Sequence, residues 1–220
     1  LKEQGKIKLT STGALPVKWV KHLYALGLPD KLIEEGISKI TREDYCPSAR
    51  RSRLVASFAG LVKVKSGSLE LTRKGERLFL DKQALLKSTI ETFSTQINFA
   101  YFDGFTSEEI ALVAPMYGLI LLSRYGHIYR PTKFYADMYF TAFPELRDNY
   151  PRHPFDDEHV AEHCYTVRYI MRFLDELGFI EWLDKNKHPS WSSSIKFKAS
   201  PFFHQALRIE VPCPSSCSTT

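Results

Sequence analysis

Residues 54–75 read LVASFAGLVKVKSGSLELTRKG, and the spacing of their apolar side chains changes at Gly60. Before that glycine, Leu54 and Phe58 lie four residues apart, as on one face of a helix. After it, apolar and charged residues alternate through LVKVK and LELT, on either side of Ser66-Gly67-Ser68. Alternation around a glycine-containing turn is typical of a β-hairpin. The stretch therefore predicts a helix that buries Leu54, Phe58 and Leu61, then a hairpin, then a further helix that begins with RKGERLF.

Three helices are predicted upstream of the hairpin. LPVKWVKHLYALG, residues 15–27, has helical spacing between a starting proline and a closing glycine. DKLIEEG, residues 30–36, fits a short helix that begins at an aspartate. CPSARRSRLVASFAG, residues 46–60, supplies the third, with Arg50 and Arg53 expected to face away from its buried side.

Three helices followed by a hairpin is the order of a winged helix-turn-helix. The residues LVASFAGLVKVKSGSLELTRKG resemble winged-helix transcription regulators, in which a long helix ends in "L…GL(V/I)" and the second wing strand runs into "LTxxG". The resemblance covers roughly residues 10–83. Upstream, KLTSTGALPVKWVKHL is similar to an "LTxxGxLPxxxV" segment of uncharacterised bacterial proteins, a likeness that implies no activity.

The last part of the chain repeats this outline. EHVAEHCYTVRYIMRFLDELGFIEWL reads as a long helix closed by Gly178 and followed by a strand, and IKFKASPF reads as a second strand. We expect a mainly α protein with β wings, in which two winged-helix-like units flank a helical middle region, whose central helix begins at Ser107. The expected divisions are 1–83 for the first unit, 84–143 for the middle region, 144–212 for the second unit, and 213–220 for a flexible tail.

Positive charge is concentrated in the first third of the chain. Residues 1–83 hold 17 Lys and Arg against 9 Asp and Glu, whereas the remainder holds 13 against 16. The resemblance implies that the third helix enters the major groove of double-stranded DNA and that the wing lies along the phosphate backbone. The DNA-binding residues would be Arg50, Arg51, Arg53, Lys63 and Lys65. Arginines also decorate solvated helix faces, and winged helices also serve as protein-interaction modules, so a non-enzymatic scaffolding protein is the alternative.

A zinc-peptidase pattern, H-x-x-E-H, occurs at His159, Glu162 and His163. Two histidines four residues apart on a helix share a face, but a zinc peptidase needs a third protein ligand. In the family with this inverted motif that ligand is a glutamate on a later helix, and the remaining glutamates here are Glu176, Glu181 and Glu210. None of them is expected on a later helix. We therefore interpret the motif as the acidic start of an ordinary helix and rank a zinc-dependent peptidase third.

The sequence predicts no catalytic residues, no metal site and no cofactor. Four scattered cysteines do not make a disulfide framework, and Cys213-Pro-Ser-Ser-Cys217 lacks the second pair of a zinc ribbon. The apolar run from Ile110 to Leu122 is too short to span a bilayer. With no visible signal peptide, we expect a cytoplasmic DNA-binding protein that acts as a transcriptional regulator or accessory factor of unknown target, with a homodimer as a further expectation and no membrane partner.

Overall fold

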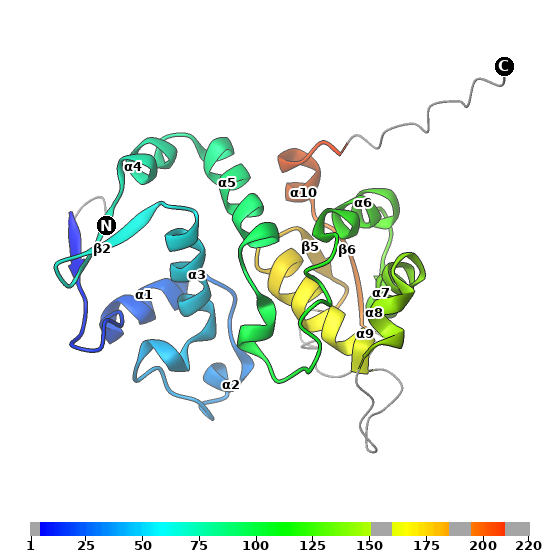
Figure 1. Cartoon of the computed structure of the whole chain (residues 1–220), viewed down its shortest axis with the longest axis horizontal. Coiled ribbons are helices and arrows are strands. Elements are labelled where there is room, and N and C mark those ends of the chain that lie inside the picture. Colours follow the sequence, from blue (N-terminus) through cyan, green and yellow to red (C-terminus); the bar gives the residue numbers. More distant parts are fainter. Residues whose placement is uncertain (1–4, 151–159, 185–194, 210–220) are drawn as a thin grey trace. The chain divides into compact units, whose positions relative to one another are not determined.

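Helices make up most of the described chain, and its strands form small antiparallel sheets (Figure 1). The structure is a computed structural model that describes residues 5–150, 160–184 and 195–209. The prediction of a mainly α protein with small β elements is confirmed at this level. Contacts divide the chain into unit 1, Leu1–Gly104, and unit 2, Phe105–Thr220. This division falls inside the expected helical middle region, and the boundaries at 83, 143 and 212 stay predictions.

Unit 1 begins with a strand, continues through helices and closes its sheet with a hairpin. The described elements are, in chain order, β1 (Lys6–Lys8), α1 (Val17–Leu26), α2 (Lys31–Glu34), the 3-10 turn η1 (Glu43–Tyr45), α3 (Pro47–Phe58), β2 (Val62–Lys65), β3 (Ser68–Leu71), α4 (Arg73–Phe79), α5 (Lys82–Thr95) and the 3-10 turn η2 (Phe99–Phe102). The three predicted helices and the hairpin are confirmed. The strand β1 was not predicted.

The sheet of unit 1 has the strand order β1-β3-β2, so the first strand pairs with the last one along the chain. Ile7 pairs with Leu69, and Leu69 pairs with Val64 on its other side. Ile7 and Leu69 are buried in a cluster with Leu15 and Val20. Because side chains alternate across a strand, the rows on either side of this one point to the opposite face of the sheet.

The buried face of α3 differs from the prediction. Ala49, Val55 and Ala59 are buried, whereas Leu54 is only partly buried and Phe58 is 53% exposed. Small side chains at Ala49 and Ala59 let α3 pack closely on its neighbours, and α3 contacts both α1 and α5. The bulky apolar residues of the sequence pattern therefore do not mark the core side of this helix.

Unit 2 contains the helices and strands that follow Gly104. Its described elements are α6 (Pro115–Tyr125), β4 (Arg130–Pro131), α7 (Thr132–Ala142), α8 (Pro144–Asp148), α9 (Val160–Tyr165), the π-helix η3 (Thr166–Asp175), β5 (Ile180–Trp182), β6 (Lys196–Ala199) and α10 (Pro201–Ala206). The expected helix start at Ser107 is wrong, because α6 begins at Pro115. A residue before proline is disfavoured in the right-handed helical region, and Ala114 has φ +49°.

The core of unit 2 is aromatic. Tyr165 stacks on Tyr139, with ring centres 4.5 Å apart, and on Tyr169, at 5.3 Å. Gly118 on α6 leaves room for the Tyr169 ring, since a Cβ at this position would lie 2.2 Å from a ring carbon. This packing joins α6, α7 and the α9–η3 helix around one stack of rings.

Both units follow the same order of strand, helix, short helix, long helix, strand and strand. In unit 1 this order is β1, α1, α2, α3, β2 and β3, and in unit 2 it is β4, α7, α8, α9–η3, β5 and β6. The strand orders also match, as β1-β3-β2 and β4-β6-β5. The predicted order of helix, glycine, strand and strand thus occurs in both units. The turn between β5 and β6 includes residues 185–194, which lie outside the described residues.

Candidate nucleic-acid interface

The arginines of α3 are not equivalent in the structure. Arg53 Nη1 lies 2.7 Å from the Oε2 atom of Glu43, and its Nη2 donates to the carbonyl of Gly13 at 3.0 Å. The same Glu43 oxygen accepts the backbone N–H of Leu15 at 2.7 Å. Glu43 is buried, so Arg53 neutralises a carboxylate inside the fold. The prediction that Arg53 faces away from the fold is wrong, because its guanidinium holds the loop before α1 to the start of α3.

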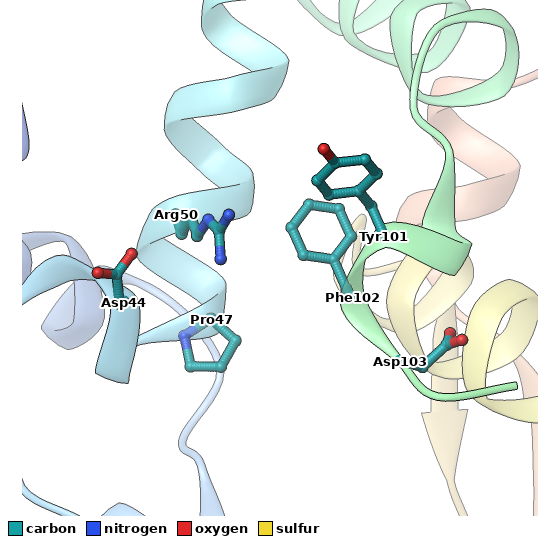
Figure 2. A pocket seen from close by; sticks show the side chains of 6 residues that line it. All are labelled: Asp44, Pro47, Arg50, Tyr101, Phe102 and Asp103. Atoms are coloured by element: carbon teal, nitrogen blue, oxygen red, sulfur yellow. The ribbon is translucent and has the colours of Figure 1, made fainter.

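Arg51 is buried, and its guanidinium carbon lies 5.7 Å from the ring centre of Phe102. Phe102 belongs to η2, a segment about fifty residues later in the sequence that packs beside α3. The guanidinium carbon of Arg50 lies 5.9 Å from the centre of the same ring, and Arg50 stays partly exposed. Of the three predicted arginines, Arg50 is the one that lines a pocket between α3 and η2 (Figure 2).

The lysines of the hairpin are exposed and lie on the outer face of the sheet. Lys63 pairs across the strands with Glu70, and Lys65 pairs with Ser68. The hairpin turns at Ser66 and Gly67, with φ values of +47° and +70°. Both lysines are exposed, and their predicted contact with DNA stays a prediction.

Strand β1 adds two further lysines to this face. Lys6 pairs with Glu70 and Lys8 pairs with Ser68, so each lies in the same row as a hairpin lysine. Lys6, Lys8, Lys63 and Lys65 are all exposed. We call these four residues the lysine face. The sequence did carry a signal for it, because Lys6-Ile7-Lys8-Leu9 alternates polar and apolar residues with the period of a strand.

The lysine face is strongly positive. Glu70 is the one acidic side chain in its rows, against four lysines. Neighbouring lysines on one strand are about 7 Å apart, and those on β1 and β2 are about 10 Å apart, from the standard rise and strand spacing. Four ammonium groups at this spacing repel one another, so an anion laid across them is favoured.

The equivalent face in unit 2 is close to neutral. Its rows hold Lys196, Lys198 and Glu181, and Lys198 Nζ lies 3.4 Å from the Oε2 atom of Glu181. Lys198 also sits over the Tyr129 ring, 5.1 Å from its centre. The two units share a topology but differ in the charge that this sheet face presents. Unit 2 therefore provides an internal control for a charge-based function in unit 1.

The zinc-peptidase pattern is only partly covered, because His159 lies outside the described residues. Glu162 is 4% exposed, and its Oε1 atom lies 2.7 Å from Arg147 Nη2 as an ion pair without hydrogen-bond alignment. The His163 ring packs edge-on against Phe105 at 5.5 Å, and burial lowers the pKa of this histidine. Among the described residues, no three His, Cys, Asp or Glu side chains gather as a metal site. Glu162 thus serves the fold as the partner of Arg147.

The four cysteines lie in two parts of the chain, two of them in the described cores and two near the C-terminal end. Cys46 and Cys164 are buried in the core, whereas Cys213 and Cys217 lie outside the described residues. Within the part of the chain that the structure describes, no helix has both the length and the apolar character needed to cross a bilayer.

Comparison of the chain with protein-family models, with curated proteins and with solved structures finds no match.

Proposed function

We propose that this chain binds double-stranded DNA and that the lysine face of unit 1 carries the contact. The observation behind the proposal is that β1 and the hairpin bring Lys6, Lys8, Lys63 and Lys65 to one face with a single glutamate among them. A duplex presents a regular, dense line of negative charge, and lysines that neutralise phosphates release the counterions around it.

The kind of binding follows from the residue type. A lysine ammonium is a compact point charge that contacts phosphate without reading the bases. The lysine face would therefore fix the position of the duplex and supply most of the affinity, with little sequence preference. Base reading would have to come from elsewhere in unit 1, and our candidate is Arg50, which is partly exposed and is not part of the Arg53–Glu43 ion pair.

We propose further that both units are winged-helix units, as the sequence resemblance implies. The supporting features are the first–third–second strand order, the long helix before the hairpin, and the repetition of the whole order in unit 2. In this proposal the hairpin β2–β3 is the wing, and α3 occupies the position of a recognition helix. A transcriptional regulator or an accessory factor would use such a unit to hold DNA.

Fluorescence anisotropy with a labelled duplex tests the proposal on the full chain. The variant in which Lys6, Lys8, Lys63 and Lys65 are all replaced by glutamine removes four charges from exposed positions and should leave the fold intact. We expect this variant to lose most of its duplex affinity. The matched control replaces Lys196 and Lys198 on the equivalent face of unit 2 and should bind almost as tightly as the wild type.

A protein-interaction module is the second candidate, and one observation favours it. Leu26, Leu32 and Ile37, near the end of α1 and around α2, are 75%, 52% and 70% exposed. Exposed apolar side chains of this size mark protein contacts when they form one patch. If the wild-type chain shows no salt-sensitive duplex binding at micromolar concentration, this candidate replaces the first.

A further inference from the structure

A pocket of about 310 Å³ opens beside the start of α3, within unit 1 (Figure 2). Its walls come from η1 and the first turns of α3 on one side and from η2 on the other. The lining residues are Asp44, Pro47, Arg50, Tyr101, Phe102 and Asp103. This volume is at the lower end of the range for small-molecule sites, which suits a ligand of one or two rings.

The η2 turn holds its rings at the pocket with a fixed backbone. Asn98 Oδ1 accepts the backbone N–H of Ala100 at 2.9 Å, and Phe99 is buried against Phe93, with ring centres 6.0 Å apart. The next residue, Tyr101, is 80% exposed. The neighbours of Tyr101 are thus anchored, while its ring stays open to solvent and offers a flat surface for a ligand.

The chemistry of the pocket combines flat apolar surfaces with charges of both signs. Figure 2 shows the Tyr101 and Phe102 rings opposite the Arg50 guanidinium, with Asp44 beside it. Aromatic rings and guanidinium planes are the surfaces on which unpaired bases stack. Arg51 lies over the Phe102 ring as well, so the charges around the pocket are of both signs and nearly balanced, and a neutral ring with donors and acceptors on its edge fits best.

We propose that this pocket binds a nucleobase with the edge pattern of guanine. Guanine carries two adjacent acceptors, O6 and N7, which match the forked donors of Arg50. It also carries N–H donors on its other edge, which a carboxylate such as Asp44 accepts. The ring would stack on Tyr101. This deepens the proposed DNA-binding function, since the base comes either from an unpaired position of a bound strand or from a free nucleoside.

Isothermal titration of the full chain with guanosine tests the pocket directly. Replacing Tyr101 with alanine removes an exposed ring, and we expect at least about fivefold weaker binding, from the usual contribution of base–aromatic stacking. Arg50→Gln should weaken binding as well, and it should narrow the preference for guanosine over adenosine, which has an amino donor in place of O6. The matched control is Phe58→Ala, because Phe58 is also exposed but lies at the other end of α3.

Further binding experiments distinguish this pocket from the lysine face and identify the source of the base. Guanosine has no phosphate, so the four-lysine variant should bind it as the wild type does while losing duplex affinity. A thymidine oligonucleotide with one central guanosine should bind tighter than the all-thymidine strand if strands supply the base. Equal binding of the two strands, with Tyr101-dependent binding of guanosine, supports the pocket and points to the free nucleoside. No guanosine binding at millimolar concentration, or equal affinity in Tyr101→Ala, overturns the proposal whatever the duplex result.

Discussion

Thr72 and Ser200 make the same pair of hydrogen bonds in the two units. Thr72 Oγ1 donates to the carbonyl of Gly60 at 2.6 Å, and Ser200 Oγ donates to the carbonyl of Gly178 at 2.7 Å. Each hydroxyl also accepts a backbone N–H from the next helix, at 2.9 Å from Gly75 and 3.1 Å from Phe203. One side chain thus ties the end of the long helix to the start of the helix after the sheet.

Removing either hydroxyl should destabilise its own unit. Thr72→Val and Ser200→Ala each remove a helix cap and leave a glycine carbonyl without its hydroxyl partner. We expect a loss of about 1–3 kcal/mol in the free energy of unfolding for each variant, measured by urea denaturation. Ser57→Ala, at an exposed position on α3, is the control. A loss below about 0.5 kcal/mol in both variants would show that these hydrogen bonds contribute little to the stability of either unit.

Arg53 should matter for stability more than Arg50 does. Arg53→Ala leaves Glu43 buried without its cation, and breaking one side of a buried pair costs about 3–5 kcal/mol when both partners are fully enclosed. Because the Arg53 side chain is 24% exposed, we expect about 2 kcal/mol. Arg50→Ala should change the free energy of unfolding by less than about 1 kcal/mol. Thermal or urea unfolding measures both variants, and an equal loss of stability in Arg53→Ala and Arg50→Ala would contradict the roles assigned to the two arginines.

The stability of unit 2 should fall as the pH rises through the pKa of Asp175. Burial raises the pKa of this carboxyl from 3.8 to about 6, while a hydrogen bond from Trp182 opposes the shift. The raised folded-state pKa means that the stabilisation is full below about pH 4 and is lost as the pH passes 6. Asp175→Asn should remove this dependence and raise stability at pH 7 by about 2 kcal/mol.

Urea unfolding of the wild type and of Asp175→Asn, followed between pH 4 and 8 by tryptophan fluorescence, measures the difference. Parallel pH profiles for the two proteins would mean that Asp175 does not titrate in this window.

The local features of the fold could be read from the sequence, whereas its long-range pairings could not. The period change at Gly60 predicts α3 and the hairpin because both depend on neighbours within a few residues. The pattern LTRKG is also local: Thr72 caps α4, and a Cβ on Gly75 would lie 2.1 Å from the Leu61 carbonyl oxygen. Strand β1 was not predicted because it has only three paired residues, and its partner strand lies some sixty residues away in the sequence.

Only part of the lysine face could be predicted from the sequence. Lys63 and Lys65 were predicted as DNA-binding residues, but Lys6 and Lys8 lie on strand β1, which was not predicted. Arg53 has helical spacing that points it outward, and only the fold shows that Glu43 reaches it. Residue types and their spacing can be taken from the sequence, but it does not show which charged side chains from distant segments form an ion pair.

The salt dependence of duplex binding tests the central claim most directly. The logarithm of the association constant should fall linearly with the logarithm of salt concentration, with a slope of about −0.9 for each phosphate neutralised. Replacing all four lysines of the lysine face with glutamine should make the slope shallower by roughly 3–4, whereas replacing Lys196 and Lys198 should change it by less than about 1. Equal slopes for the wild type and the four-lysine variant would contradict the account, because the lysine face would then contact no phosphate.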